Sequence, residues 1–410
     1  MKKIFSALFI IFTAISCSSP EAKDPAPDPA AAPVDPSAIS SSCPFLTSDD
    51  KGNIVLSWVR DLNDSASIMC YAISSDKGRT FGKPVEIPSS SNVHPHGENM
   101  PKIIFKPGGE IIAAWGASNS NPKNKYSGLV FYTQSFDAGK SWTEAKPLVT
   151  DTASYDQRYF DMGLLPNGEA GIIWLDNRKE GKAEGSTLYF ASTKGKNGFQ
   201  DETPVAKTIC QCCRTDLFID KKGSIHASFR DIINDSIRDM VHIVSTDNGK
   251  TFSAPERISK DNWVINGCPH TGPAMTQNKN GFHFAWYTMG NGQGVFYCNS
   301  KDNCASYSSR DSVSGRSSAK HPQIITLQDD DLVVVWDETV QKGEKYNAWI
   351  GLQQRDAEGK TMSTRYVSPD TAVSEFPVIL SAGDNSIVLA YSTKGSKNKQ
   401  VVSQVIHLTE

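Results

Sequence analysis

An eight-residue pattern, Ser-x-Asp-x-Gly-x-(Ser/Thr)-aromatic, occurs three times in this 410-residue chain and constrains its fold more than any other feature. The copies read SSDKGRTF, SFDAGKSW and STDNGKTF, at residues 74–81, 135–142 and 245–252. In each copy the Asp can accept backbone N–H bonds within a tight turn, and the Gly supplies a positive φ. The hydroxyl can hold the backbone locally, and the aromatic ring can pack between neighbouring layers. Because each copy follows a β-like run, the pattern predicts repeated β-sheet units.

A longer repeat surrounds these turns. It consists of a short apolar strand, a polar turn that usually contains Gly, and a longer strand that often ends in Trp. Seven copies begin at Cys43, Met100, Phe160, Arg214, Gly272, His321 and Phe376. Their spacing of about 45 to 60 residues is typical of propeller blades. Helix-length amphipathic runs are absent from the sequence, so we predict an all-β chain.

These repeats resemble the Asp boxes, or BNR repeats, of the sialidase-like β-propeller superfamily. The resemblance implies a single β-propeller of four-stranded antiparallel blades. We predict seven blades, and six, the number in sialidases proper, is the alternative. The seventh unit has three obvious strands, so we expect a strand near residues 38–42 to complete it and close the ring. In the fifth unit we expect a disulfide between Cys298 and Cys304 to clamp the hairpin in place of an Asp box.

The N-terminus has the pattern of a bacterial lipoprotein. Residues 1–17 combine two lysines, an apolar run and the lipobox-like sequence Ala-Ile-Ser-Cys, which makes Cys17 the expected site of lipidation. A secretory signal cut elsewhere is the alternative. Residues 18–41 are rich in Pro, Ala, Ser and Asp and predict a disordered tether. The propeller is expected over 42–410.

These features predict a location in the cell envelope, outside the cytoplasm, at the outer membrane or the periplasmic face. Membrane contact is expected through the lipid anchor alone. The net charge of −3 argues against nucleic acid as a partner. We expect a monomer that takes a glycan or another small ligand at one end of the propeller channel, because the connections that enter the first strand of each blade converge there.

The resemblance implies one possible chemistry at this channel mouth, an exo-sialidase-type glycoside hydrolase. Such a site needs arginines for a sugar carboxylate, a Tyr nucleophile with a Glu partner, and an acidic acid/base. The candidates at rim positions are Arg60, Asp61, Arg214, Arg230, Asp231, Tyr287 and Glu375. The chain departs from the family's Arg-Ile-Pro motif, because the first blade opens with Ser42-Cys43-Pro44. Whether the protein is an enzyme therefore stays open, and structural salt bridges or a non-catalytic interaction scaffold are the alternatives.

Cysteine and histidine in the same connections suggest a different chemistry. Thiolate and imidazole ligands suit copper or zinc, so a metal or redox site is possible. The candidate ligands are His94, His96, Cys210, Cys212, Cys213, Cys268 and His270. Setting Cys17 aside, eight of the nine cysteines remain. In an exported protein an even set also fits disulfides, for example between Cys268 and the Cys210–Cys213 cluster.

Overall fold

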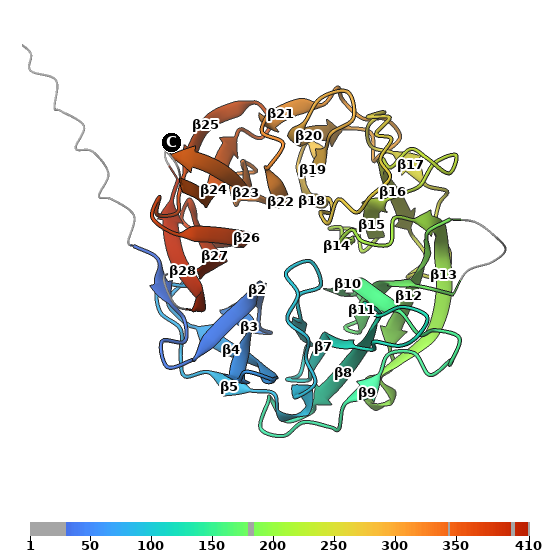
Figure 1. Ribbon diagram of the computed structural model, residues 1–410, viewed down its shortest axis with the longest axis vertical. Coiled ribbons are helices and arrows are strands. Elements are labelled where there is room, and N and C mark those ends of the chain that lie inside the picture. The colour runs from blue at the N-terminus through green and yellow to red at the C-terminus, as the bar shows by residue number, and fades with distance from the viewer. Residues whose placement is uncertain (1–29, 179–183, 343–344, 395–397, 409–410) are drawn as a thin grey trace, which may run out of the picture.

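The computed structural model describes residues 30–178, 184–342, 345–394 and 398–408, which form a seven-bladed β-propeller (Figure 1). Each blade is a four-stranded antiparallel sheet, and the blades follow one another around a central channel in chain order. The predictions of an all-β chain and of seven rather than six blades are confirmed. Cys17, the predicted lipidation site, lies outside the described residues.

The strands of each blade run from the channel outward in chain order, except in the last blade. Blades one and two are β2 (Ser40–Ser48), β3 (Ile54–Asn63), β4 (Ala66–Ser74), β5 (Val85–Glu86), β6 (Lys102–Phe105), β7 (Ile111–Ser118), β8 (Gly128–Ser135) and β9 (Lys146–Pro147). Blades three and four are β10 (Gln157–Leu164), β11 (Ala170–Asp176), β12 (Ser186–Thr193), β13 (Phe199–Ile209), β14 (Asp216–Ile219), β15 (Ile225–Arg230), β16 (Met240–Ser245) and β17 (Glu256–Arg257). Blades five and six are β18 (Ala274–Asn278), β19 (Gly281–Thr288), β20 (Gly294–Ser300), β21 (Asp311–Ser314), β22 (Lys320–Thr326), β23 (Leu332–Lys342), β24 (Lys345–Arg355) and β25 (Thr361–Tyr366). Blade seven is β26 (Val373–Gly383), β27 (Ser386–Lys394), β28 (Lys399–His407) and β1 (Ala32–Pro33), and two short 3-10 helices, η1 (Pro88–Ser90) and η2 (Gly195–Asn197), complete the elements.

The ring is closed by β1, which pairs antiparallel with β28 through Ala32↔Ser403 and Pro33↔Val402. This corrects the expectation that residues 38–42 complete the seventh blade, because Ser40 already begins β2 of the first blade. The closing strand comes from inside the range 18–41 that the sequence predicted as tether. Proline is tolerated there because β1 is the outermost strand and its missing N–H faces no ladder partner.

The second strand of every blade carries a buried aromatic side chain that packs the blades together. These residues are Trp58, Trp115, Trp174, Phe229, Trp286, Trp336 and Tyr391, none more than 2% exposed. The indole N–H groups of Trp115, Trp174, Trp286 and Trp336 each donate to an Asn, Asp or Glu oxygen. The Trp-ending strands of the sequence repeat are therefore the inter-blade core.

The Asp boxes are the turns between the third and fourth strands of their blades. In the box of blade four, Asp247 Oδ1 accepts the Thr251 N–H at 2.9 Å and the Ser245 hydroxyl at 2.8 Å, and its Oδ2 accepts the Thr251 hydroxyl at 2.6 Å. These bonds favour the ionised carboxylate and lower its pKa to about 2. The connections that contain the Cys and His residues run from the fourth strand of one blade to the first strand of the following blade. They leave the fourth strand at the end opposite the Asp box, so the topology puts them on the face of the propeller that carries no Asp boxes.

Blade five also contains an Asp box, which the sequence pattern missed. Asp302 accepts the Ser306 N–H at 2.9 Å and the Ser300 hydroxyl at 2.9 Å, as in the other boxes. Cys304 occupies the position of the box glycine, and its backbone N–H donates to Ser300 Oγ at 2.8 Å. No disulfide joins Cys298 to Cys304, and all eight cysteines of the described residues are free thiols. The predicted staple is therefore absent from the structure, and hydrogen bonds hold this turn instead.

Candidate functional site

A pocket of ≈ 640 Å³ at the channel mouth is lined by the connections entering blades two, four and five, by the β7–β8 loop and by the start of β10. Five of the seven predicted metal ligands line it: His94, His96, Cys212, Cys268 and His270. They come from the β5–β6, β13–β14 and β17–β18 connections, which are far apart in the sequence. The fold therefore brings together the Cys and His residues that the sequence placed at the mouth.

Cys210, Cys212 and Cys213 form a buried cluster just after β13. Cys210 Sγ lies 3.6 Å from Cys212 Sγ and 3.8 Å from Cys213 Sγ. Sulfur ligands at about 2.3 Å from one tetrahedral metal ion would be about 3.8 Å apart, so the spacing fits a shared ion. Cys212 also lines the pocket, whereas Cys210 and Cys213 lie behind it, 1% exposed.

The cluster favours one thiolate. Hydrogen bonds from the Cys212 and Cys213 thiols lower the pKa of Cys210, and the guanidinium groups of Arg230 and Arg238 add to this effect. Burial raises the pKa of Cys213, and hydrogen bonding to Cys210 raises that of Cys212. The negative charge is therefore concentrated on Cys210, and the thiolate is the form of cysteine that binds metal.

The three histidines of the pocket differ in readiness to bind a metal. His270 Nδ1 lies 3.0 Å from the Cys268 carbonyl oxygen, which can only accept, so Nδ1 carries the proton and Nε2 has a free lone pair. His96 Nδ1 instead accepts the Glu98 N–H at 3.2 Å, and burial lowers the pKa of His96. No hydrogen bond of the His94 ring is found among the described residues. His270 is therefore already in the ligating tautomer, and His96 would have to break a bond to ligate through Nε2.

A charged cluster in the channel was missed by the sequence analysis. His321 lies between two carboxylates, with Nδ1 2.7 Å from Asp337 Oδ2 and Nε2 3.1 Å from Glu98 Oε1. Burial lowers the pKa of His321, but Asp337 and Glu98 raise it by more, so the net shift is upward. Glu98 and His321 stand in HPHGENMP and KHPQ, so the signal was an acidic residue beside the histidines of these connections.

The same channel holds Lys102, Asp161 and Asp216 beside Arg214. Lys102 Nζ lies 3.6 Å from Asp161 Oδ1. Burial and the charge of Asp161 raise the pKa of Asp216 to about 8. Arg214 is 4% exposed and donates to the Pro322 carbonyl at 3.2 Å, while its Nε and Nη1 have no hydrogen-bond partner among the described residues.

The three arginines proposed to hold a sugar carboxylate do not form one open site. Arg60 is tied to Asp35 at 2.5 Å and to Glu86 at 2.7 Å. Arg230 is fully buried and donates to the carbonyls of Arg238 and Tyr287. Arg214 is the one that faces the channel cluster. Their contacts match the alternative reading, in which arginines tie loops to blades.

The other catalytic candidates are also dispersed. The Tyr287 hydroxyl donates to the Ser317 carbonyl at 2.8 Å, and no contact with Glu375 of β26 is found among the described residues. Asp61 accepts the Ser67 hydroxyl at 2.8 Å. Asp231 is 9% exposed and accepts the Thr208 hydroxyl, and burial raises its pKa. None of these pairs has the geometry of a nucleophile and its base.

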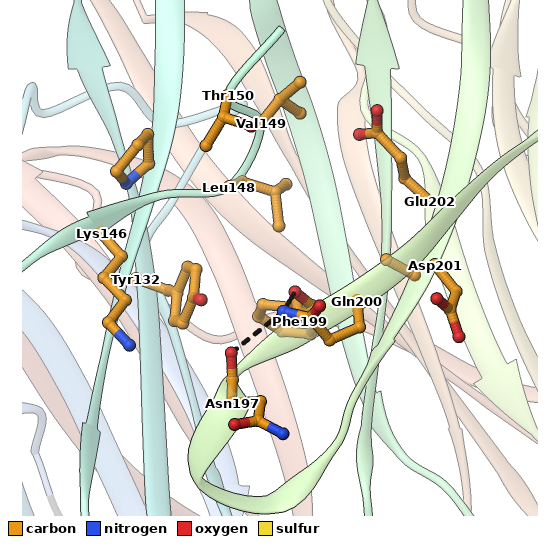
Figure 2. A pocket seen from close by; sticks show the side chains of 12 residues that line it. Tyr132, Lys146, Leu148, Val149, Thr150, Asn197, Phe199, Gln200, Asp201 and Glu202 are labelled. Atoms are coloured by element: carbon orange, nitrogen blue, oxygen red, sulfur yellow. Dashed lines mark hydrogen bonds between the residues drawn. The ribbon is translucent and has the colours of Figure 1, made fainter.

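A second pocket, of ≈ 440 Å³, lies between the outer strands of blades two and three (Figure 2). Tyr132, Phe199 and Glu202 are among its lining residues, and Gln200 Nε2 donates to the Asn197 carbonyl at 3.1 Å. None of the residues predicted for the site lines this pocket, so the channel mouth is the better candidate.

No family model matches the chain, and no curated protein matches its sequence. Solved structures do match. An ulvan lyase bound to a glucuronate–rhamnose-sulfate oligosaccharide gives a TM-score of 0.55 at 10% identity, over 90% of this chain and 94% of the lyase. The chain has the fold of the sialidase-like β-propellers. The intramolecular trans-sialidase of Ruminococcus gnavus gives 0.50 at 10% identity, over 90% of this chain and 95% of that one.

A protein of unknown function from Dyadobacter fermentans gives a TM-score of 0.52 at 14% identity, over 77% of this chain and 97% of its own. At such identities the likeness concerns the fold. Among the described residues, no helix has the length and hydropathy needed to span a bilayer.

Proposed function

We propose that the protein binds a soft metal ion, monovalent copper, at the channel mouth. The observation that carries this proposal is the sulfur spacing of 3.6 and 3.8 Å in the Cys210–Cys212–Cys213 cluster. Such a buried set of thiols suits Cu⁺ because thiolate is a soft ligand. His270 and Cys268 are exposed and line the same pocket as Cys212.

Location in the cell envelope, through a lipid on Cys17, is part of this proposal. Outside the cytoplasm unprotected thiols are oxidised, and a bound soft metal would keep the three cysteines reduced. The proposal thus explains how a buried C-x-C-C run can stay free of disulfides in an exported protein.

The test is a Cu⁺ titration of the reduced, tag-free full chain under anaerobic conditions, in competition with a chromophoric Cu⁺ chelator. We expect wild type to take one equivalent from the chelator and Cys212→Ser to lose it. Cys70→Ala is the matched control, because Cys70 is a buried thiol in the core of blade one and should leave binding unchanged. Failure of folded, reduced wild type to retain Cu⁺ would overturn the proposal.

A second candidate function is the binding or hydrolysis of an acidic glycan at the same mouth. Arg158 and Tyr126 line the pocket, and Tyr126 is 71% exposed, as a sugar-stacking ring would be. The ulvan lyase and the trans-sialidase, which act on sugars, share the fold. Sialidase-type hydrolysis has less support than binding, since Arg60 and Arg230 are committed to contacts elsewhere.

This second function is tested by incubating wild type and Arg158→Ala with sialylated and uronic-acid-containing oligosaccharides. Binding that Arg158→Ala weakens, without release of sugar, supports a glycan-binding mouth. Release of sialic acid by wild type would instead support the hydrolase. If the protein neither binds these oligosaccharides nor releases sugar from them, the glycan function is refuted and the copper proposal is unaffected.

A further inference from the structure

Most neighbouring blades share one packing contact, with which the interface between blades four and five can be compared. In four interfaces an aromatic ring of the third strand covers a glycine in the outer hairpin of the next blade. The pairs are Tyr71/Gly139, Tyr132/Gly198, Phe190/Gly249 and Tyr297/Gly359, and a Cβ at any of these glycines would come within 1.9–2.3 Å of a ring carbon or hydroxyl oxygen. The position therefore accepts a glycine under a ring and excludes a side chain.

The interface between blades four and five breaks this rule on both sides. Cys304 stands where the box glycine stands elsewhere, and His242, three residues before the box serine, stands where the ring stands. Cys304 has φ 67, in the left-handed region that residues with a Cβ resist. The thiol is thus held at this position against the preference of its backbone, and it points into the interface, 8% exposed.

His226 of β15 completes a cluster with these two side chains. One ligand atom from each of His226, His242 and Cys304 lies within 4.8 Å of the others. His226 Nδ1 and His242 Nε2 are 2.9 Å apart. Two imidazole nitrogens bound to one tetrahedral zinc at about 2.0 Å would be about 3.3 Å apart, so a small movement would admit the ion. The histidines are 1% and 2% exposed, so both ligand nitrogens are shielded from solvent.

The outer nitrogens of both rings face oxygen atoms. His226 Nε2 lies 3.5 Å from Asp220 Oδ2 and has no closer hydrogen-bond partner among the described residues. His242 Nδ1 lies 3.4 Å from the Tyr307 hydroxyl. Histidines bound to zinc commonly direct their second N–H to a carboxylate or another oxygen, which orients the ring. Both rings therefore have the outer partners of zinc ligands.

The next blade contains the same arrangement without the ligands. His283 occupies the register position of His226, each paired with the residue before its box serine. Its Nδ1 lies 2.7 Å from the Tyr297 hydroxyl and its Nε2 2.8 Å from Asn278 Oδ1, so hydrogen bonds satisfy both nitrogens. Relative to this arrangement, the interface between blades four and five has His242 for Tyr297, Asp220 for Asn278 and Cys304 for Gly359. Each change introduces a zinc ligand or the carboxylate that supports one.

We propose that His226, His242 and Cys304 bind a zinc ion that fastens blade four to blade five. The three side chains are buried, so the ion would enter during folding, and they leave one tetrahedral position for a further ligand such as water. It is separate from the channel mouth, because its cysteine belongs to an Asp box on the opposite face. The proposal does not rest on copper binding at the mouth.

The test is to refold the full chain from urea and a chelator, with or without Zn²⁺, and to measure bound zinc and the melting temperature. All proteins carry Cys212→Ser, which removes the mouth thiol from the zinc count. We expect one equivalent of zinc and a higher melting temperature in this background. Cys304→Gly and the double variant His242→Tyr/Cys304→Gly should both lose the zinc and its effect on melting. Both should fold, since the first frees the position under the ring and the second installs the Tyr–Gly pair of the other interfaces.

The matched control is His283→Gln, in the neighbouring arrangement, which should keep the zinc. Cobalt in place of zinc gives an independent reading, because a thiolate ligand produces a charge-transfer band that Cys304→Gly should abolish. Absence of zinc from the folded Cys212→Ser protein, or its retention by Cys304→Gly, would overturn the proposal. His226 and His242 would then be a hydrogen-bonded pair without a metal. If Cys212→Ser does not fold, the same comparison is made in the wild-type background. Cys304→Gly should then bind one equivalent of zinc less than wild type, and an equal zinc content would overturn the proposal.

Discussion

Replacing Arg230 by alanine distinguishes a structural arginine from a substrate-binding one. Its guanidinium is fully buried and donates to the carbonyls of Arg238 at 2.9 Å and Tyr287 at 2.7 Å. It also stacks on the Trp263 ring at 4.9 Å. Two hydrogen bonds from a charged group contribute about 3–6 kcal/mol and the stacking about 1 kcal/mol. The cost of burying a cation whose Nε has no partner among the described residues reduces this sum, so we expect a loss of about 3–5 kcal/mol.

The assay is equilibrium urea unfolding followed by tryptophan fluorescence, since Trp263 contacts the arginine directly. Lys250→Ala, which removes an exposed cation, is the control and should stay within about 0.5 kcal/mol of wild type. An Arg230→Ala protein as stable as this control would refute the structural assignment. If it also lost glycan binding, Arg230 would return to the set of candidate binding residues.

Three further outcomes are expected. The raised pKa of Asp216, about 8, means that the folded state holds this proton more tightly than the unfolded one, so stability should fall between pH 4 and 8; the pH dependence of the melting temperature should flatten in Asp216→Asn, and an unchanged slope would contradict the assignment. Gly249→Ala should destabilise more than Gly52→Ala, since both have positive φ but only the former would clash, at 2.2 Å from Phe190; equal urea midpoints would argue against ring-over-glycine packing. Cys17→Ser should abolish incorporation of labelled fatty acid into the expressed protein, and continued labelling would exclude lipidation at that residue.

The sequence predicted the blades well because their determinants are local. An Asp box needs eight consecutive residues, and a second strand ending in Trp needs about as many, so both could be read without knowing what lies beside them. The Asp box of blade five escaped because Cys304 replaces the glycine that the pattern demanded, although Asp302 and Ser306 keep their hydrogen bonds. The closing strand escaped because Ala32–Pro33 has no strand-like pattern and pairs only because β28 offers an open edge.

The site was predicted in part. The connections were correctly placed at one mouth, since strand order alone decides which loops share a face. Which side chains enter the pocket depends on neighbouring blades, so the sequence could not show that Arg60 contacts Asp35 or that Arg230 contacts the Tyr287 carbonyl. The charged pair of Glu98 and His321 joins residues more than 200 positions apart, a contact that no local pattern encodes.

The closure of the ring by β1 has a mechanical consequence. A tether attached upstream of Ala32 would transmit tension first to blade seven, where the two-residue strand would peel away from β28 one pair at a time. The next resistance is the ion pair between Asp35 and Arg60, 2.5 Å long, which crosses to blade one. Arg60 would thus act as the stop that keeps tension on an anchored chain from opening the seam between the first and last blades.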